Sequence, residues 1–168
     1  MLKKFILNKL IRLYKIAASE SQNRIYEQYR NKYSLDKTFR FNGVDILLYG
    51  DGQIHCGKGS YIGAYSSVLA YKNCTVIIGE GCSISHNVRL YTHTNEADQD
   101  FSVYPLIEKT GNITIGNFVW IGANVLINPG IAIGDNSVIG ANSVVTRNIE
   151  PFSIVGGVPA VLIRKKNL

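Results

Sequence analysis

The sequence predicts an all-β protein built around a parallel β-helix. Three observations lead to this fold class. Apolar residues recur every six positions from Ile115 onward, turn-forming residues recur between them, and the pattern is interrupted once, after His93. Steps of about 100° would scatter residues six apart around an α-helix, whereas in a strand they return to the same side. Short internal periods of this kind are typical of a β-helix.

From residue 115 the chain reads in six-residue blocks: IGNFVW, IGANVL, INPGIA, IGDNSV, IGANSV and VTRNIE. We expect the first residue of each block to point into the core: Ile115, Ile121, Ile127, Ile133, Ile139 and Val145. The fifth residue supplies a second inward position: Val119, Val125, Ile131, Ser137, Ser143 and Ile149. Glycine, asparagine and aspartate between them suit tight turns. Each block therefore predicts a short strand and a bend.

The earlier part of the chain carries the same pattern less regularly. Its apolar positions fall into two sets, Ile62 with Val68, and Ile78 with Ile84 and Leu90. The step from Leu90 to Ile115 is one position longer than four blocks. We therefore expect residues 94–112 to form a loop extruded from one corner of a β-helix domain spanning 41–168, with a tail at 151–168. Long ordered loops are usually functional.

The net charge of +6 is concentrated at the two ends of the chain. Residues 1–37 hold nine Lys/Arg and three Asp/Glu, and residues 164–168 hold three cations, whereas the part between holds six basic and nine acidic groups. A nucleic-acid binder would array basic and aromatic residues across a folded face. The charge pattern therefore argues against nucleic acid as a partner.

The opening stretch MLKKFILNKLIRLYKIAA predicts an amphipathic helix within an N-terminal extension of residues 1–40. One face is apolar: Leu2, Phe5, Ile6, Leu10, Leu13 and Ala17. The opposite face is polar: Lys4, Asn8, Arg12 and Lys15. The cations leave no apolar run long enough for a signal peptide or a membrane span. The helix either packs on the body or a neighbouring subunit, or attaches residues 1–18 peripherally to an anionic membrane at its inner face.

Three cysteines, Cys56, Cys74 and Cys82, cannot form an even set of disulfides. Cys82 also falls at a small-residue position of the repeat, so we expect buried, reduced thiols and a cytoplasmic protein.

The ordered motifs VWIG, NPG, IGDNSVIGANSVVT and GGVPA in the last third of the chain carry a family resemblance. The sequence resembles the hexapeptide-repeat acyltransferases, in particular the sugar O-acetyltransferase branch with the maltose and galactoside enzymes. The resemblance implies a left-handed β-helix with three strands per coil, a homotrimer, and acetyl-CoA bound between neighbouring subunits without a metal. Its catalytic histidine lies where the extruded loop begins, and His93 matches that place.

The candidate residues follow from the resemblance together with the repeat. Residues expected to bind acetyl-CoA are Trp120, Gly122, Ala123, Ala141, Thr146, Arg147, Arg164 and Lys165. Ala123 and Ala141 are three blocks apart and should stack on one corner, and a fork-shaped guanidinium at Arg164 suits a phosphate. Residues expected to contact the acceptor are Asn87, Asn95, Glu96 and Asp98.

These features predict an O-acetyltransferase that acts on a sugar hydroxyl, with surface polysaccharide as the expected acceptor. A neutral imidazole at His93 would take the hydroxyl proton and return it to the departing thiolate. His86 is the alternative base, and an amino-sugar amine is the alternative acceptor. Two further classes are a non-catalytic scaffold and a zinc carbonic anhydrase, although zinc needs converging ligands and no third histidine follows His86 and His93.

Overall fold

The computed structural model describes residues 2–167, which divide into a helical unit ending at Lys32 and a β unit starting at Tyr33. Helix α1 spans Leu2–Lys32. Its sequence contains neither glycine nor proline, the two residues that most disfavour a helix interior. Arg30 and Lys32 lie in its last turn, where cations favour the helix dipole. No helix among the described residues is both long and apolar enough to cross a membrane.

The β unit consists of three sheets, named A, B and C, and one separate hairpin. Sheet A contains β1 (Ser34–Leu35), β4 (Gln53–Cys56), β7 (Thr75–Ile78), β12 (Ile113–Ile115) and β15 (Ala132–Ile133). Sheet B contains β2 (Arg40–Asn42), β5 (Tyr61–Gly63), β8 (Ser83–Ile84), β13 (Trp120–Ile121), β16 (Val138–Ile139), β18 (Ser153–Gly156) and β19 (Val161–Lys165). Sheet C contains β3 (Leu47–Tyr49), β6 (Ser67–Leu69), β9 (Arg89–Tyr91), β14 (Leu126–Ile127) and β17 (Val144–Val145). The hairpin pairs β10 (His93–Asn95) with β11 (Glu108–Thr110).

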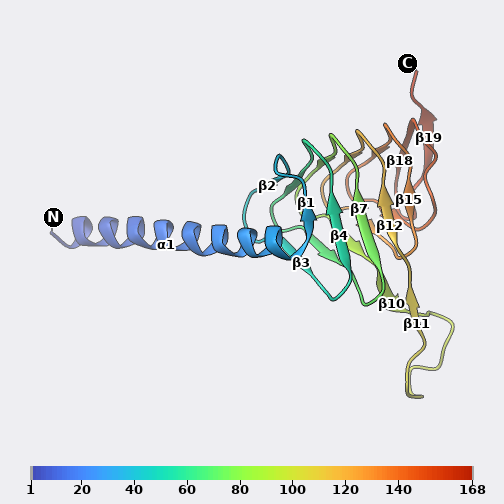
Figure 1. The fold of residues 1–168 in the computed structure, drawn as a ribbon, viewed down its shortest axis with the longest axis horizontal. Helices are drawn as coiled ribbons and strands as arrows, with labels where there is room; N and C mark the ends of the chain where they lie inside the picture. Colours follow the sequence, from blue (N-terminus) through green and yellow to red (C-terminus); the bar gives the residue numbers. More distant parts are fainter. Residues whose placement is uncertain (1, 168) are drawn as a thin grey trace. The chain divides into compact units, whose positions relative to one another are not determined.

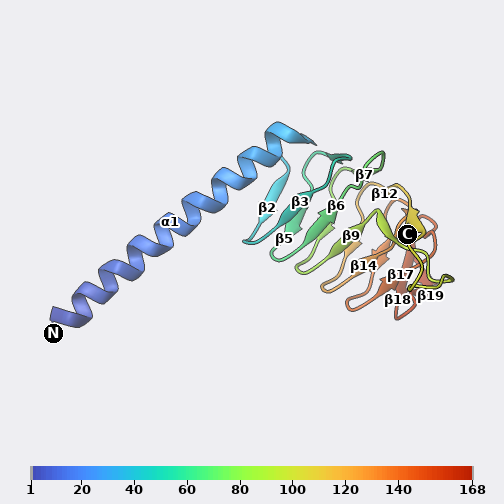
Figure 2. The same ribbon diagram turned by 90° about the horizontal axis from the view of Figure 1, so that it is seen from below.

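The chain visits sheets A, B and C in turn, and each coil stacks in parallel on the coil before it (Figures 1 and 2). Five coils contribute one strand to each sheet. Strand β18 then extends sheet B in parallel, and β19 turns back antiparallel to it at the edge. Strand β1 begins at Ser34, inside the segment 1–40 that the sequence assigned to the N-terminal extension.

The core of the late coils is formed by the predicted inward residues. All six block leaders are buried: Ile115, Ile121, Ile127, Ile133, Ile139 and Val145. The fifth-position residues are also buried, except that Ile149 is half-buried. Ser137 and Ser143 are accommodated because their hydroxyls donate to the carbonyls of Glu150 and Gly140. Each fully buried isoleucine stabilises the fold by about 1.5–3 kcal/mol.

One corner between sheets B and C carries a ladder of asparagines: Asn87, Asn124 and Asn142. Their φ angles of 56°, 59° and 59° lie in the left-handed region, which asparagine tolerates better than most residues. The Asn87 amide donates to the Asn124 side chain at 2.7 Å, and the Asn124 amide donates to Asn142 at 2.9 Å. The ladder ties three successive coils together.

The extruded segment interrupts a coil without disturbing its register. In the asparagine ladder, Asn124 and Asn142 are 18 apart in sequence, whereas Asn87 and Asn124, which span the insertion, are 37 apart. The difference equals the length of the segment 94–112. The insertion lies between sheets C and A and projects from the coils through β10 and β11 (Figure 1). At its base, the Gly111 amide donates to the Thr92 carbonyl at 3.0 Å.

Candidate active site

His93 is the first residue of the hairpin and follows the anchored residue Thr92. Thr92 is buried at the corner between sheets C and A. Its hydroxyl donates to the Leu69 carbonyl at 2.9 Å and accepts from the Tyr71 amide at 2.8 Å. The Cys74 thiol lies 3.8 Å from the Thr92 carbonyl. These contacts to the preceding coil fix the backbone from which the imidazole projects.

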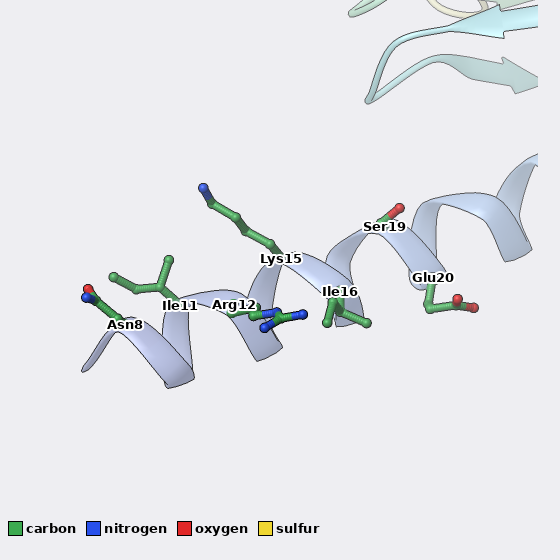
Figure 3. Close-up of a pocket in the computed structure, with 7 residues that line it drawn as sticks. All are labelled: Asn8, Ile11, Arg12, Lys15, Ile16, Ser19 and Glu20. Carbon is green, nitrogen blue, oxygen red and sulfur yellow. The ribbon is translucent and has the colours of Figure 1, made fainter. Parts of the chain in front are cut away.

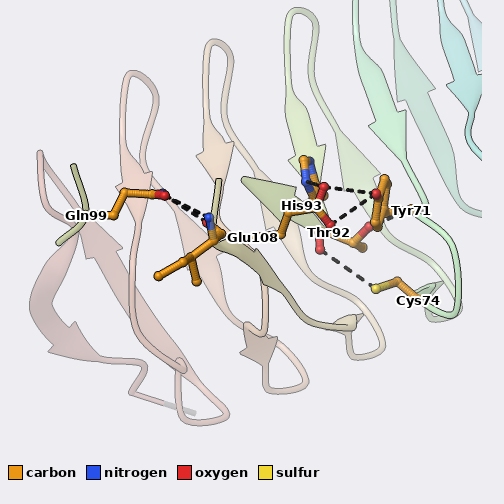
Figure 4. A network of polar contacts seen from close by, with 7 residues as sticks. Tyr71, Cys74, Thr92, His93, Gln99 and Glu108 are labelled. Atoms are coloured by element: carbon orange, nitrogen blue, oxygen red, sulfur yellow. Dashed lines mark hydrogen bonds and ion pairs between the residues drawn. The ribbon is translucent and has the colours of Figure 1, made fainter. Parts of the chain in front are cut away.

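The imidazole of His93 lies against an aromatic ring and also contacts a carboxylate (Figure 4). The ring of Tyr71 stacks on it with centroids 4.2 Å apart and an interplanar angle of 24°. The Nε2 atom of His93 lies 3.4 Å from Oε1 of Glu108. The Tyr71 hydroxyl contacts both oxygens of the same carboxylate, at 3.2 and 3.1 Å. Three side chains therefore form one connected cluster at the base of the hairpin.

The buried Nε2 atom of His93 has no hydrogen-bond partner, although Glu108 lies within ion-pair distance. The contact between Nε2 and the Glu108 carboxylate is therefore close, but its direction is poor for a hydrogen bond. The His93 side chain is only 25% exposed, whereas that of Glu108 is 48% exposed. The contact is thus electrostatic, and it becomes an ion pair once the imidazole carries a proton on both nitrogens.

Tyr71 and Glu108 are the two residues that the sequence interpretation missed. Tyr71 belongs to the coil that precedes His93. The adjoining strands pair Val68 with Leu90, and continuing this register along the chain brings Tyr71 beside His93. Glu108 pairs with Asn95 across the hairpin, and His93 and Asn95 share a face because side chains alternate along a strand. The hydrogen bond to Glu108 raises the pKa of the Tyr71 phenol, with the carboxylate charge acting in the same direction.

The loop between the two hairpin strands is braced by its own side chains. The Gln99 amide nitrogen donates to the carbonyls of Glu96 and Ile107, at 2.6 and 3.0 Å, and its oxygen accepts from the Ile107 amide at 2.7 Å. Asp100 accepts from the amide and hydroxyl of Ser102, which lowers the pKa of Asp100. The hairpin therefore presents an ordered surface beside His93.

The predicted acceptor residues separate into two places. Asn95, Glu96 and Asp98 lie on the hairpin, close in sequence to His93, and Glu96 is 4.0 Å from the ammonium group of Lys109. Asn87 instead belongs to the asparagine ladder at the other corner, where its amide donates to Asn124. A structural role thus occupies part of the hydrogen-bonding capacity of Asn87.

The other two histidines lie away from this cluster. His86 is exposed and lines an open hollow of about 470 Å³ together with Asn42, Tyr61 and Tyr65, at the corner between sheets B and C. His55 is half-buried within β4 of sheet A. Only His93 lies against a carboxylate within ion-pair distance among the described histidines.

The predicted acetyl-CoA residues lie on two corners and at the C-terminal edge. Trp120 in sheet B is 55% exposed. Gly122, Ala123 and Ala141 form the adjoining corner, where a Cβ on Gly122 would lie 2.6 Å from the Ala141 amide nitrogen. Coil stacking therefore requires a glycine there. Thr146 lies at the corner between sheets C and A, the corner that carries His93 further along the stack.

The predicted phosphate-binding cations are only partly brought together. Arg147 and Lys165 line the same cavity of about 280 Å³, between the last coil and β19. Arg164 does not line this cavity, and its guanidinium donates to the Lys165 carbonyl at 3.2 Å. Adjacent residues of a strand point to opposite faces, which accounts for the separation of Arg164 from Lys165.

All three cysteines are buried and free, which includes Cys82, whose burial the repeat predicted. The Cys82 thiol lies 3.0 Å from the Gly116 carbonyl, and burial raises its pKa. A thiol held in its protonated form is a poor nucleophile. Among residues 2–167, no three His, Cys, Asp or Glu side chains gather in a way that would hold a metal ion.

Comparison with known proteins finds similarity to hexapeptide-repeat acetyltransferases. The family model "Bacterial transferase hexapeptide (six repeats)" matches residues 112–147. The chain is 32% identical over 142 residues to a chloramphenicol acetyltransferase of Klebsiella aerogenes, covering 67% of this chain and 68% of that protein. It is 41% identical over 124 residues to the galactoside O-acetyltransferase of Escherichia coli K12, covering 71% and 57%.

Solved structures show the same likeness. A hexapeptide-repeat acetyltransferase of Vibrio cholerae complexed with acetyl-CoA has 28% identity and a TM-score of 0.70, covering 84% of this chain and 76% of that chain. A maltose O-acetyltransferase from Clostridium difficile 630 has 32% identity and a TM-score of 0.61, covering 79% and 72%.

The stacked parallel coils and the similarity to these proteins define a protein of the β-helix acyltransferase class. The chain belongs to the hexapeptide-repeat acetyltransferase family. The predicted fold class, a left-handed parallel β-helix with an N-terminal helix, is confirmed. The chain spans 57–68% of the length of these two curated relatives.

Proposed function

We propose that the protein transfers an acetyl group from acetyl-CoA to a hydroxyl group of a sugar, within a surface polysaccharide or its precursor. The observation that carries this proposal is the cluster of His93, Glu108 and Tyr71 at the base of the hairpin. Relatives include a galactoside and a polysialic acid O-acetyltransferase, the latter 37% identical over 121 residues. Acetyl-CoA or CoA is bound in related structures.

In the proposed reaction His93 is the general base. As the acceptor oxygen attacks the thioester carbonyl, the neutral imidazole removes the hydroxyl proton, and the thiolate of CoA later receives it. Because Nε2 is buried against Glu108, the proton from the acceptor is taken at Nδ1. Glu108 stabilises the imidazolium that forms. No covalent acyl-enzyme is required, which fits thiols that are all buried.

Glu108 and Tyr71 act as positioning residues for His93. The Tyr71 hydroxyl donates to the carboxylate, so Glu108 is held toward the imidazole while the Tyr71 ring fixes the imidazole plane from one side. The Tyr71 phenol is protonated at neutral pH even with an ordinary pKa, and the contact with Glu108 raises that pKa further, so the hydroxyl stays a donor. On the hairpin, Asn95, Glu96 and Asp98 are the polar side chains available to sugar hydroxyls.

We further propose that acetyl-CoA lies between copies of the chain in a homotrimer. The small residues Ala123 and Ala141 leave the backbone of one corner accessible to a pantetheine arm, whereas His93 lies on another corner. A neighbouring copy brings two such corners together. Exposed Trp120 supplies apolar surface that favours such a contact. The cations available for the CoA phosphates are Arg147 and Lys165, with Arg164 at the same edge.

An acceptor screen scored by release of the CoA thiol tests this function. We expect turnover with a galactoside or a sialic acid oligomer and little with chloramphenicol, which serves as the alternative acceptor. His93→Ala should lower turnover by at least about a hundredfold with acetyl-CoA affinity nearly unchanged. His86→Ala is the matched control for loss of an imidazole. Near-normal turnover of His93→Ala with an inactive His86→Ala would move the base to His86.

A further inference from the structure

The charged residues in the first half of α1 are all cations. Residues 1–18 contain five Lys/Arg and no Asp/Glu. The two acidic residues of the helix, Glu20 and Glu27, both belong to its second half, where Arg24, Arg30 and Lys32 mix with them. The cations of the first half therefore have no acidic partner on their own stretch of helix.

The same stretch carries a continuous apolar face. Ile6, Leu10 and Leu13 recur at intervals of four and three residues, which places them on one side of a helix. Their side chains are 49%, 57% and 55% exposed. Leu7 and Tyr14 widen this face and are also exposed. Large exposed apolar patches mark interaction surfaces.

Three of the five cations occupy the side opposite to that face, whereas the helical spacing places Lys3 and Lys9 nearer to it. Lys4, Arg12 and Lys15 recur at intervals of eight and three residues, and all three are exposed. Figure 3 shows Arg12 and Lys15 extending from the helix beside Ile11 and Ile16, around a shallow hollow of about 530 Å³. Long basic side chains of this kind keep their charge in water while their aliphatic stems cover apolar surface.

Charge decides what covers the apolar face. In a parallel bundle with other copies of the chain, the five cations of each copy would repel one another, because residues 1–18 offer no carboxylate for a cross-chain pair. An anionic lipid surface attracts the same cations, and its hydrocarbon boundary accepts the apolar face. A helix with an apolar face and a basic polar face is suited to lie in the membrane interface.

We propose that the N-terminal half of α1, residues 4–18, docks on the surface of an anionic lipid bilayer, with Ile6, Leu10 and Leu13 at the acyl boundary. Each Lys or Arg near such a surface contributes roughly a fivefold gain in partitioning. Loss of three cations should therefore weaken binding by roughly a hundredfold. This inference does not depend on the transfer chemistry.

Sedimentation of the full chain with lipid vesicles tests the proposal. We expect binding to vesicles of phosphatidylcholine mixed with phosphatidylserine, and little binding to phosphatidylcholine alone. The triple variant Lys4→Gln/Arg12→Gln/Lys15→Gln should lose most of it. The matched control Arg24→Gln/Lys37→Gln/Lys58→Gln removes three cations elsewhere and should bind as wild type does. Raising salt to about 1 M, where the Debye length falls to about 3 Å, should release the protein.

The double variant Leu10→Glu/Leu13→Glu probes the apolar face and should also fail to bind. Equal binding to both vesicle types, or wild-type binding by the Lys/Arg triple variant, would overturn the proposal. If light scattering without lipid gave a lower mass for Leu10→Glu/Leu13→Glu than for wild type, the apolar face would pack against another copy of the chain. This result would also overturn the proposal. Thiol release measured on each variant distinguishes these outcomes from failure of the proposed enzymatic function.

Discussion

Replacing Glu108 by glutamine removes the charge beside His93 and keeps the shape of the side chain. The glutamine oxygen still accepts a hydrogen bond from the Tyr71 hydroxyl, so the geometry of the cluster is retained. What is lost is the attraction between carboxylate and imidazolium across 3.4 Å, the distance from Oε1 to Nε2. This attraction exists only once His93 has taken the acceptor proton. The substitution therefore raises the barrier rather than weakening substrate binding.

The size of the effect follows from Coulomb's law and the exposure of the pair. Two unit charges about 4 Å apart interact by about 4 kcal/mol at an effective dielectric constant of about 20. The Glu108 side chain is 48% exposed, so solvent screens a large part of this attraction. We expect about 1–1.5 kcal/mol to remain, which corresponds to a roughly tenfold lower kcat.

Steady-state kinetics of thiol release provides the assay. Glu108→Gln should show the lower kcat with an unchanged KM for acetyl-CoA and an unchanged melting temperature. Glu80→Gln, an exposed turn residue, is the control for loss of one carboxylate. If Glu108→Gln matched wild type in kcat, the carboxylate would have no role in the transition state. A raised KM with normal kcat would instead make Glu108 a binding residue.

Two further predictions concern the co-substrate and the thiols. Ala141→Trp should abolish acetyl-CoA binding in calorimetry while leaving the melting temperature nearly unchanged, because Ala141 is an exposed corner residue; binding at wild-type affinity would place the pantetheine arm elsewhere. Cys56, Cys74 and Cys82 are buried, so a thiol-specific reagent should leave the native protein unmodified and label all three after unfolding in guanidinium. Rapid labelling of the native protein would contradict that burial.

The late coils were predictable because their period is strict. Ile121 pairs with Ile139, and Ile127 with Val145, each at a spacing of three blocks, so a block leader returns to the same sheet in the next coil. The early coils pair at longer spacings, as Tyr61 does with Ser83. Bends of unequal length shift the phase of the repeat in the early coils, so a strict six-residue count does not predict which residues pair between coils.

The cluster around His93 shows where the sequence becomes insufficient. The histidine was singled out because the periodicity breaks beside it and because the family resemblance implies a catalytic histidine at that place. Its partners Tyr71 and Glu108 come from the preceding coil and from the far strand of the hairpin, so they are recognised only when both registers are known. Asn87 was predicted to contact the acceptor, and its hydrogen bond to Asn124 in the asparagine ladder was not foreseen. Side-chain partnership across coils is the information that a repeat pattern does not contain.

The hairpin projects from the β-helix and takes no part in the stacking of its coils. Ile78 pairs with Ile115 and Leu90 pairs with Ile127, so the hydrogen bonds between coils run past the insertion as if residues 94–112 were not there. Closing a longer loop costs only about 0.6 kcal/mol for each doubling of its length. Changes in the length or sequence of the tip, residues 96–107, should therefore leave the stacking of the coils and the place of the proposed catalytic imidazole unchanged.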